Sequence, residues 1–385
     1  MNQGREREIA PDAIRGIALL GILIVNIPFM SLFSEEGLRG VWVEGEINGI
    51  FALLIQALFT GKFYLLFAFL FGYSANFIIK GERTNRVKWV RRSIALILLG
   101  MIHFTFFWHG DILFAYGLFS LLLIPFLFRS DRTLTIWGRV IYGIFTTILT
   151  LAAAFLLLGN QVVPEEFVEE EIQSSELDQA LVEGSFIDAI SPRIELWIFG
   201  LIFGILLQGG FIYVAFLTGL RAGRTRFLSR TAEEVGAVRM MKVGIGLGLP
   251  VQLIAAWIMV QNEQSPFTSI AVFVASLALT FVTAPLLSYG YVGFFLWTIE
   301  RAPKIVNWLT PAGRMSLTVY LSQSVVATFI FGPWGLGLFQ ELQIPLVVLV
   351  ALIIWLSLIV LARLWLSKFD QGPMERILQR FTHWR

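Results

Sequence analysis

Ionisable residues are scarce in the apolar parts of this sequence, and His109 and Asp111 are the pair best suited to chemistry. They flank Gly110 in a short break between two apolar runs. A histidine that a carboxylate orients or charges can act as a general base. Residues i and i+2 do not face each other on a helix, so this pairing requires the backbone to turn at Gly110. The competing interpretation is that Asp111 caps the start of the helix that follows it.

A second polar pair, Arg15 and Asn26, lies in the first long apolar run. With Leu19 and Ile22 these residues are spaced by four, three and four positions, so they share one helix face. We predict that Arg15 binds an anion at the cytoplasmic end, and that Asn26 works with His109 and Asp111 in an outer polar pocket. Alternatively, Arg15 pairs with Asp12 at the membrane interface, and Asn26 bonds a neighbouring helix.

A stripe of small and polar residues near the C-terminus is predicted to contact substrate. Ser316, Tyr320 and Gln323 recur at helical spacing. Polar side chains are unfavourable in contact with lipid, so this face should point into the protein. Arg314 precedes the stripe at the cytoplasmic mouth, and the alternative is that these residues only pack the helices together. Lys62 either lines the outer pocket or extends its ammonium to the lipid headgroups.

The remaining candidate for a buried base is His103, which has no charged neighbour in sequence. We interpret it as a buried histidine that bonds a facing helix. The sequence has three His and no Cys, so we expect no metal site. The absence of Cys also excludes disulfides and thiolate nucleophiles. Motifs of serine hydrolases, phosphate-binding loops and zinc proteases are missing as well.

Composition indicates that these residues are positioned by membrane-spanning helices. Of 385 residues, 57% are hydrophobic and 15% are charged, against about 25% charged in soluble proteins. The lipid bilayer is therefore the expected partner, with a homodimer left open. The net charge of only +2 argues against nucleic acid.

The apolar runs predict an all-α, polytopic bundle of about ten spans, since a spanning helix needs about 20 apolar residues. The expected spans are 10–31, 63–80, 92–108, 110–128, 134–158, 194–219, 239–260, 268–298, 313–332 and 344–366. The apolar stretch 47–60 is too short, and we predict a helix that lies on or dips into the outer surface.

The distribution of Lys and Arg predicts that both termini are cytoplasmic, because basic residues gather in cytoplasmic loops. With the N-terminus inside, only three of the 29 Lys and Arg fall outside, namely Arg39, Lys62 and Arg193. We expect one transmembrane domain over residues 1–385. It would carry an acidic outer loop at about 159–193 and a cytoplasmic amphipathic segment at about 367–385.

Several stretches resemble the bacterial YeiB family, whose C-terminal part is called domain of unknown function 418. The matching stretches follow the family order along nearly the whole chain: Pro11–Ile22 with Asn26, Gly61–Tyr64 with Leu70–Gly72, His109–Leu113 with Ala115 and Tyr116, Gly313–Thr318 and Gly372–Arg376. The resemblance implies a multi-pass protein of the bacterial plasma membrane.

The YeiB family is in turn similar to membrane acyltransferases of the heparan-glucosaminide N-acetyltransferase type. That similarity implies an acyl group taken from cytoplasmic acyl-CoA and delivered to an acceptor outside, with Arg15 and Arg314 meeting the CoA phosphates. Asn26 matches an Asn that works there with a His in the next loop. Residues 31–46 contain no His, so His109 or Asp111 would have to substitute.

Two other functions remain open from the sequence. A ten-helix bundle with sparse interior polar groups also suits a transporter or flippase, although no matched pair of broken helices points to one. A non-catalytic protein that binds a lipid or small molecule is the third hypothesis. It would tolerate the loss of His109.

Overall fold

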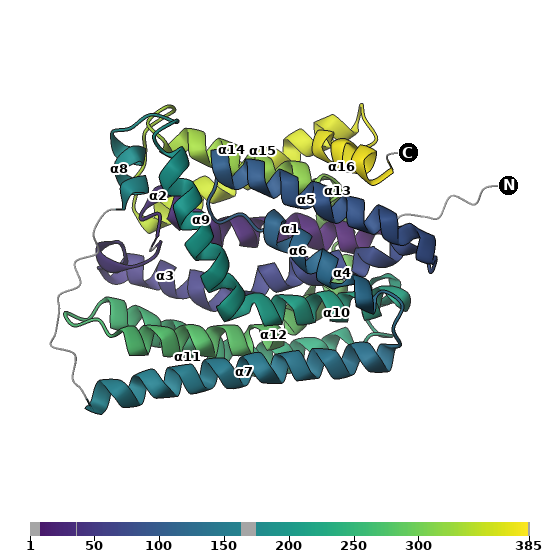
Figure 1. Cartoon of the computed structure of the whole chain (residues 1–385), viewed down its shortest axis with the longest axis horizontal. Helices are drawn as coiled ribbons and strands as arrows, with labels where there is room; N and C mark the ends of the chain where they lie inside the picture. Colours follow the sequence, from purple (N-terminus) through teal and green to yellow (C-terminus); the bar gives the residue numbers. More distant parts are fainter. Residues whose placement is uncertain (1–7, 36, 163–174, 384–385) are drawn as a thin grey trace.

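A computed structural model describes residues 8–35, 37–162 and 175–383. The described chain is helical, and its one β-bridge joins Phe33 and Gly37. The helices are α1 (Ile9–Asn26), α2 (Pro28–Ser31), α3 (Glu46–Leu58), α4 (Lys62–Ile79), α5 (Arg86–Phe106), α6 (Leu113–Leu122), α7 (Asp131–Val162), α8 (Glu176–Val182), α9 (Ile190–Gly204), α10 (Gly210–Arg224), α11 (Ala237–Glu263), α12 (Ile270–Arg301), α13 (Pro303–Arg314), α14 (Ser316–Phe331), α15 (Ile344–Leu366) and α16 (Pro373–His383). The expected all-α bundle is confirmed (Figure 1).

Eight segments of the described chain are long and apolar enough to cross a membrane. They contain α1, α3 with α4, α5, α7, α9 with α10, α11, α12 and α15. Two shorter apolar helices, α6 and α14, occupy the other two predicted spans. Each of the ten predicted spans therefore has a helix, whereas the number that crosses the bilayer stays a prediction.

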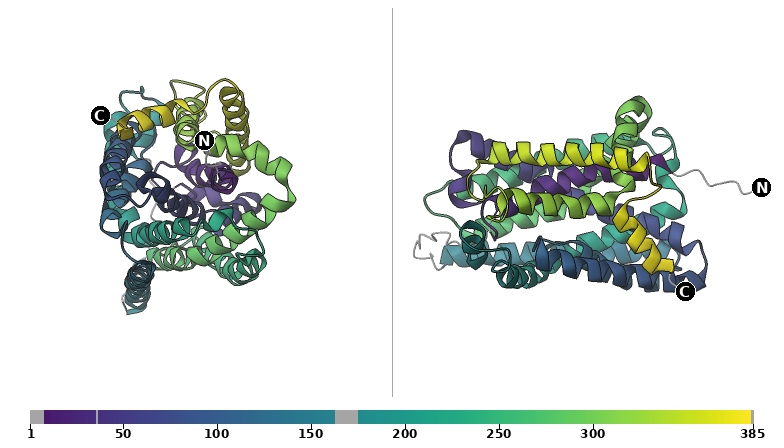
Figure 2. Two further views of the ribbon diagram at one scale, coloured as in Figure 1. Left: turned by 90° about the vertical axis from the view of Figure 1, so that its right-hand side faces the viewer. Right: turned by 90° about the horizontal axis from the view of Figure 1, so that it is seen from above.

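The centre of the bundle is α1, and α7 lies at its edge. In α1 72% of the apolar window is buried inside the protein, against 11% in α7. The end-on view shows α7 standing apart from the other helices (Figure 2). Burial of polar residues on α1 is thus burial among other helices, which is where a site can form.

Both described ends of the chain, the start of α1 and the end of α16, lie at the same end of the bundle (Figures 1 and 2). The strongest helix pairings are α11 with α12, α4 with α10, α1 with α13 and α5 with α6. These pairings place α5 and α6 beside each other across the short break that holds His109 and Asp111.

The structure departs from the predicted elements in two places. The connection between the expected spans 268–298 and 313–332 contains most of helix α13, which packs against α1 and α15. The stretch 47–60 forms α3 and runs with α4 as one apolar segment of 34 residues, broken near Gly61, where φ is +83°. Within the acidic loop predicted at 159–193, residues 163–174 lie outside the described residues, and the rest includes α8.

Candidate functional site

A buried pair of His103 and Asp111 forms the centre of the candidate site. The Nδ1 atom of His103 lies 3.0 Å from Oδ1 of Asp111, and the two side chains are 1% and 0% exposed. The carboxylate also accepts the backbone N–H groups of Leu113 (3.2 Å) and Phe114 (3.0 Å) in the first turn of α6. Asp111 therefore stabilises a helix start, as one interpretation predicted, and its histidine partner is His103 rather than His109.

The turn between α5 and α6 brings this pair together. The backbone N–H groups of Phe107 and Trp108 both donate to the carbonyl of His103, which closes the end of α5. A Cβ on Gly110 would lie 2.5 Å from the Trp108 ring, so only glycine fits the backbone against the indole there. Asp111 is thereby folded back onto the last turn of α5.

The second ring nitrogen of His103, Nε2, is buried and unpaired among the described residues. With the Asp111 carboxylate ionised, Nδ1 carries the proton and Nε2 presents its lone pair. A carboxylate-oriented imidazole with a free Nε2 is the arrangement of a general base.

Tyrosines surround the pair. The Tyr320 ring lies 5.2 Å from the His103 ring, and its hydroxyl oxygen accepts the backbone N–H of Ile112 (3.3 Å). Among the described residues that hydroxyl bonds no acceptor, so its own hydrogen remains to be donated. Asp111 lies within electrostatic range of Tyr320, as do two further tyrosines, Tyr64 and Tyr116.

Asn26 joins this cluster through Tyr64. The Tyr64 hydroxyl donates to Oδ1 of Asn26, and the Tyr116 hydroxyl donates to the Tyr64 carbonyl (2.7 Å). Asn26 is 6% exposed. We call the whole set, drawn from α1, α4, α5, α6 and the turn before it, and α14, the histidine–tyrosine cluster: Asn26, Tyr64, His103, Asp111, Tyr116 and Tyr320.

The other predicted substrate contacts lie apart from the cluster's hydrogen bonds. Gln323, one turn after Tyr320, donates to the Leu19 carbonyl (3.2 Å) and ties α14 to α1. Ser316 begins α14 and is half-buried. Lys62 does not extend to headgroups: it is 0% exposed, and its ammonium donates to the Gln56 carbonyl (2.9 Å).

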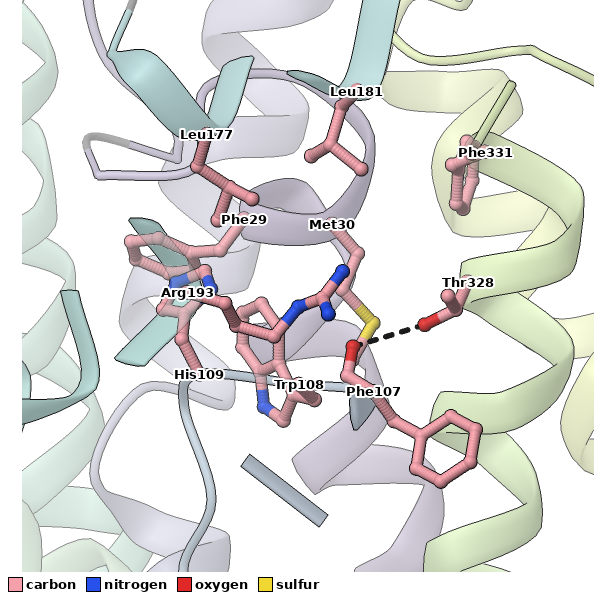
Figure 3. Close-up of a pocket in the computed structure, with 11 residues that line it drawn as sticks. Phe29, Met30, Phe107, Trp108, His109, Leu177, Leu181, Arg193, Thr328 and Phe331 are labelled. Carbon is pink, nitrogen blue, oxygen red and sulfur yellow. Dashed lines mark hydrogen bonds between the residues drawn. The ribbon is translucent and has the colours of Figure 1, made fainter. Parts of the chain in front are cut away.

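His109 belongs to a different place in the fold. It is half-buried and lines a small cavity with Trp108 and Arg193 (Figure 3). Its ring centroid is 4.2 Å from that of Trp108, and its ring bonds the backbone of Ser34. The structure thus separates the two predicted catalytic residues of the turn, Asp111 into the histidine–tyrosine cluster and His109 into this cavity.

The protonation of His109 gives a first testable prediction. Burial and the positive charge of Arg193 lower the pKa of His109 to about 3, whereas an unfolded chain has a histidine pKa of about 6.5. Between these values the unfolded state binds a proton that the folded state does not, so this contribution to stability is lost as pH falls from about 6.5 toward 3. We expect the Tm difference between the wild type and His109→Gln to shrink over this pH range. A difference that stays constant would contradict the buried, neutral histidine.

Three arginines gather at the other end of α1. Arg15 bonds Asp12 (2.9 Å) and reaches the Leu70 carbonyl (3.5 Å), so the predicted ion pair is present. Arg92 lies within electrostatic range of Arg15. Arg314 donates to the Asp370 carbonyl (3.1 Å). We call Arg15, Arg92 and Arg314 the arginine cluster.

Arg92 was missed as a site residue because the sequence places it in a basic loop with five other cations. In the structure it is half-buried in α5, with its guanidinium 5.6 Å over the Phe71 ring. Its Nε, like that of Arg314, is buried without a hydrogen-bond partner among the described residues. Planar cations with free donors suit phosphate groups.

Comparison with known proteins shows what the chain is similar to. A model of the family described as "Protein of unknown function (DUF418)" matches residues 222–385. The uncharacterized protein YxaH of Bacillus subtilis (strain 168) is 28% identical over 401 aligned positions, which cover 97% of this chain and 93% of YxaH. YeiB of Escherichia coli (strain K12) is also 28% identical, with 98% and 96% covered. The chain is thus similar to YeiB over nearly its whole length. A 39.9 kDa protein in the amylase 3′ region of Bacillus acidopullulyticus is 22% identical over 97% of this chain and 92% of its own.

The segment that matches the DUF418 model holds the C-terminal half of the candidate site. Residues 222–385 include Arg314, Tyr320 and Gln323, whereas His103 and Asp111 come from the part before it. The candidate site therefore spans both parts of the chain. No group of three or more His, Asp or Glu side chains that could hold a metal ion occurs among the described residues.

Glu375, in the last of the YeiB-like stretches, fastens the C-terminal helix to the bundle. Its carboxylate accepts the backbone N–H groups of Leu317 (2.8 Å) and Thr318 (3.1 Å) and the Thr318 hydroxyl (2.6 Å). It therefore caps the N-terminus of α14 from another helix. Its negative charge also interacts favourably with the positive end of the α14 dipole.

Removing this cap gives a second prediction. Glu375→Ala should destabilise the protein by about 1–2 kcal/mol, because three donors lose their acceptor. Thermal unfolding in detergent measures the effect, and protease cleavage near α16 should become faster. Glu341→Ala, at an exposed glutamate, is the matched control and should leave both unchanged. Equal behaviour of the two variants would contradict the capping role.

Proposed function

We propose that this protein is a membrane acyltransferase that moves an acyl group from cytoplasmic acyl-CoA to an acceptor on the other side of a bacterial plasma membrane. The observation that carries the proposal is the buried His103–Asp111 pair with its free Nε2. A base of this kind has a use when a hydroxyl or amine must lose a proton as it attacks a carbonyl. Asp111 orients the imidazole and stabilises its protonated form.

The reaction balances with these groups. The acceptor oxygen or nitrogen attacks the thioester carbonyl while Nε2 of His103 takes the acceptor proton. The Tyr320 hydroxyl donates to the oxyanion of the tetrahedral intermediate. The carbon–sulfur bond then breaks, the acyl group stays on the acceptor, and the proton on His103 passes to the departing CoA sulfur.

The arginine cluster supports an acyl-CoA donor. Arg92 and Arg314 have no carboxylate of a described residue within 4 Å that would neutralise them. The phosphates of CoA would supply that charge through charge-assisted hydrogen bonds. Arg15 and Asn26, eleven residues apart on α1, are about 16 Å apart along the helix axis. An extended pantetheine arm can connect two such sites.

The orientation rests on the distribution of charge. Basic loops on one side and both described chain ends at one end of the bundle support a cytoplasmic arginine cluster. The histidine–tyrosine cluster would then face the outside.

The donor site gives a third prediction. Arg92→Gln and Arg314→Gln should each raise the KM for acyl-CoA by about tenfold or more with a smaller change in kcat, because a charge-assisted bond to phosphate is lost. Release of the CoA thiol by purified protein measures both constants. Arg39→Gln is the control, since Arg39 is bonded to Glu263 (3.1 Å) far from α5 and α14. An unchanged KM in both variants, or no CoA release with any acyl-CoA and acceptor, would refute the proposed donor.

A further inference from the structure

A narrow cavity lies between the end of α5, the start of α9 and the short helix α8. Its walls are mostly apolar and include Phe29, Phe331 and, from α8, Leu177 and Leu181 (Figure 3). The cavity volume of about 20 Å³ suffices for about one water molecule. This place is separate from the histidine–tyrosine cluster and from the arginine cluster.

The cavity contains one buried cation, Arg193. The residue is 2% exposed, and its guanidinium points toward Thr328 and the Phe107 carbonyl (Figure 3). Its Nη1 donates to the carbonyls of Thr105 (3.3 Å) and Phe106 (3.1 Å) at the end of α5. The remaining donors, on Nε and Nη2, meet no acceptor among the described residues.

Among the described residues, no carboxylate forms an ion pair with Arg193. No acidic group of the described residues lies within 4 Å of it. Asp178, the buried one of the two acidic residues in α8, instead accepts the backbone N–H of Ser34 (2.9 Å) and caps its own helix. The two helix-end carbonyls supply only partial negative charge. A buried ion without a full counter-charge is expensive to keep.

The surroundings exclude a cation and favour an anion. Thr328 donates its hydroxyl to the Phe107 carbonyl (3.0 Å), so that nearby acceptor is already engaged. The depressed pKa of His109 shows that the same surroundings disfavour a second positive charge. Phe29 and Trp108, whose ring centroids are 6.4 Å apart, line the cavity with aromatic rings that carry no charge.

We propose that this cavity binds one small monovalent anion, of the size of chloride or formate, on the free donors of Arg193. The cavity is too narrow for a phosphate or a sulfate and has a single cation to balance one negative charge. The bound anion would neutralise Arg193 and hold together α5, α8 and α9. This inference does not depend on acyl transfer.

The test is the unfolding temperature of the full-length protein in detergent, with chloride exchanged for gluconate at constant ionic strength. Constant ionic strength keeps the screening of surface charges equal. A ligand that binds only the folded state raises Tm, and we expect a rise of about 2 °C for the wild type in chloride or formate. In sulfate, the Tm of the wild type should be no higher than in gluconate. The relative effect of chloride and formate identifies the anion as a halide or a carboxylate.

Two variants locate the effect. Arg193→Gln removes the cation, and Leu181→Phe fills the cavity while Arg193 stays in place, so the second variant remains informative if the first does not fold. Both should lose the chloride- or formate-dependent rise, whereas Arg39→Gln, at an outer arginine that has its own carboxylate, should keep it. The proposal is overturned if the wild type shows no rise, if sulfate gives the largest rise, or if Leu181→Phe keeps it.

Discussion

His103→Gln is expected to lower CoA release in the presence of acceptor by about 10²–10⁴-fold, the usual contribution of a general base. Gln keeps a polar side chain of similar length but cannot accept the acceptor proton at neutral pH. Among the described residues no contact joins His103 to the arginine cluster, so the variant should still bind the donor normally. The loss should therefore appear in kcat. Asp111→Asn should cause a comparable loss, since the imidazole would no longer be held in the reactive tautomer.

His109→Gln is the matched control for this experiment. Both variants replace a histidine at the same end of the bundle, but His109 faces the Arg193 cavity. We expect its turnover to stay within about twofold of the wild type at neutral pH, where His109 is neutral. If His109→Gln lost as much activity as His103→Gln, the assignment of the base to the His103–Asp111 pair would fail.

Gly313→Ala is expected to have the largest effect on stability. A Cβ at this position would lie 1.6 Å from the backbone oxygen of Asp12, and a backbone atom cannot rotate out of the way. Helices α1 and α13 would have to separate, which we expect to cost about 3 kcal/mol or more and to lower Tm by about 5 °C or more. The same shift moves Arg15 and Arg314 relative to each other, so KM for acyl-CoA should rise in any folded material.

Gly246→Ala controls for the chemistry of the substitution. A Cβ on Gly246 meets nothing within 4 Å, and alanine is the better helix former by about 1 kcal/mol. This variant should therefore match or exceed the wild-type Tm. A Gly313→Ala protein with wild-type Tm would show that α1 and α13 are not in the close contact described.

Much of the fold could be predicted from apolar run length. A helix forms in each predicted span because burial or lipid contact of about 20 apolar residues leaves the backbone no other way to satisfy its hydrogen bonds. Helix α13 was not predicted, since residues 303–314 contain two prolines and several polar side chains. In the structure Pro303 stands at the helix start, where its missing N–H costs nothing, and Val306 and Leu309 are buried.

The charge distribution also hid specific contacts. Three basic residues, Arg39, Lys62 and Arg193, were predicted to lie on the outer side as exceptions to the charge rule. In the structure Arg39 bonds Glu263, Lys62 is fully buried, and Arg193 reaches the end of α5. These three exceptions to the charge rule thus each have a structural or binding role. A charge buried among helices is costly and is kept where it has such a role.

The candidate site was only partly predictable. Asp111 and Asn26 were identified by residue type and position, but the partner of Asp111 was expected two residues away. The actual partner, His103, is eight residues away on α5. That contact depends on the tight turn at Gly110 under the Trp108 ring, and helical spacing does not describe such a turn. Tyr64 and Tyr116 were missed because their hydroxyls find partners only across helices: Tyr64 of α4 bonds Asn26 of α1, and Tyr116 of α6 bonds the Tyr64 carbonyl of α4.

Transfer across the membrane is tested most directly in proteoliposomes of uniform orientation, with acyl-CoA carrying a labelled acyl group supplied only on the side of the arginine cluster. The account predicts that free CoA appears on the supply side and the label appears on an acceptor on the opposite side, with both signals lost in His103→Gln and kept in His109→Gln. Intact acyl-CoA with no labelled acceptor, or label on the supply side alone, would contradict it.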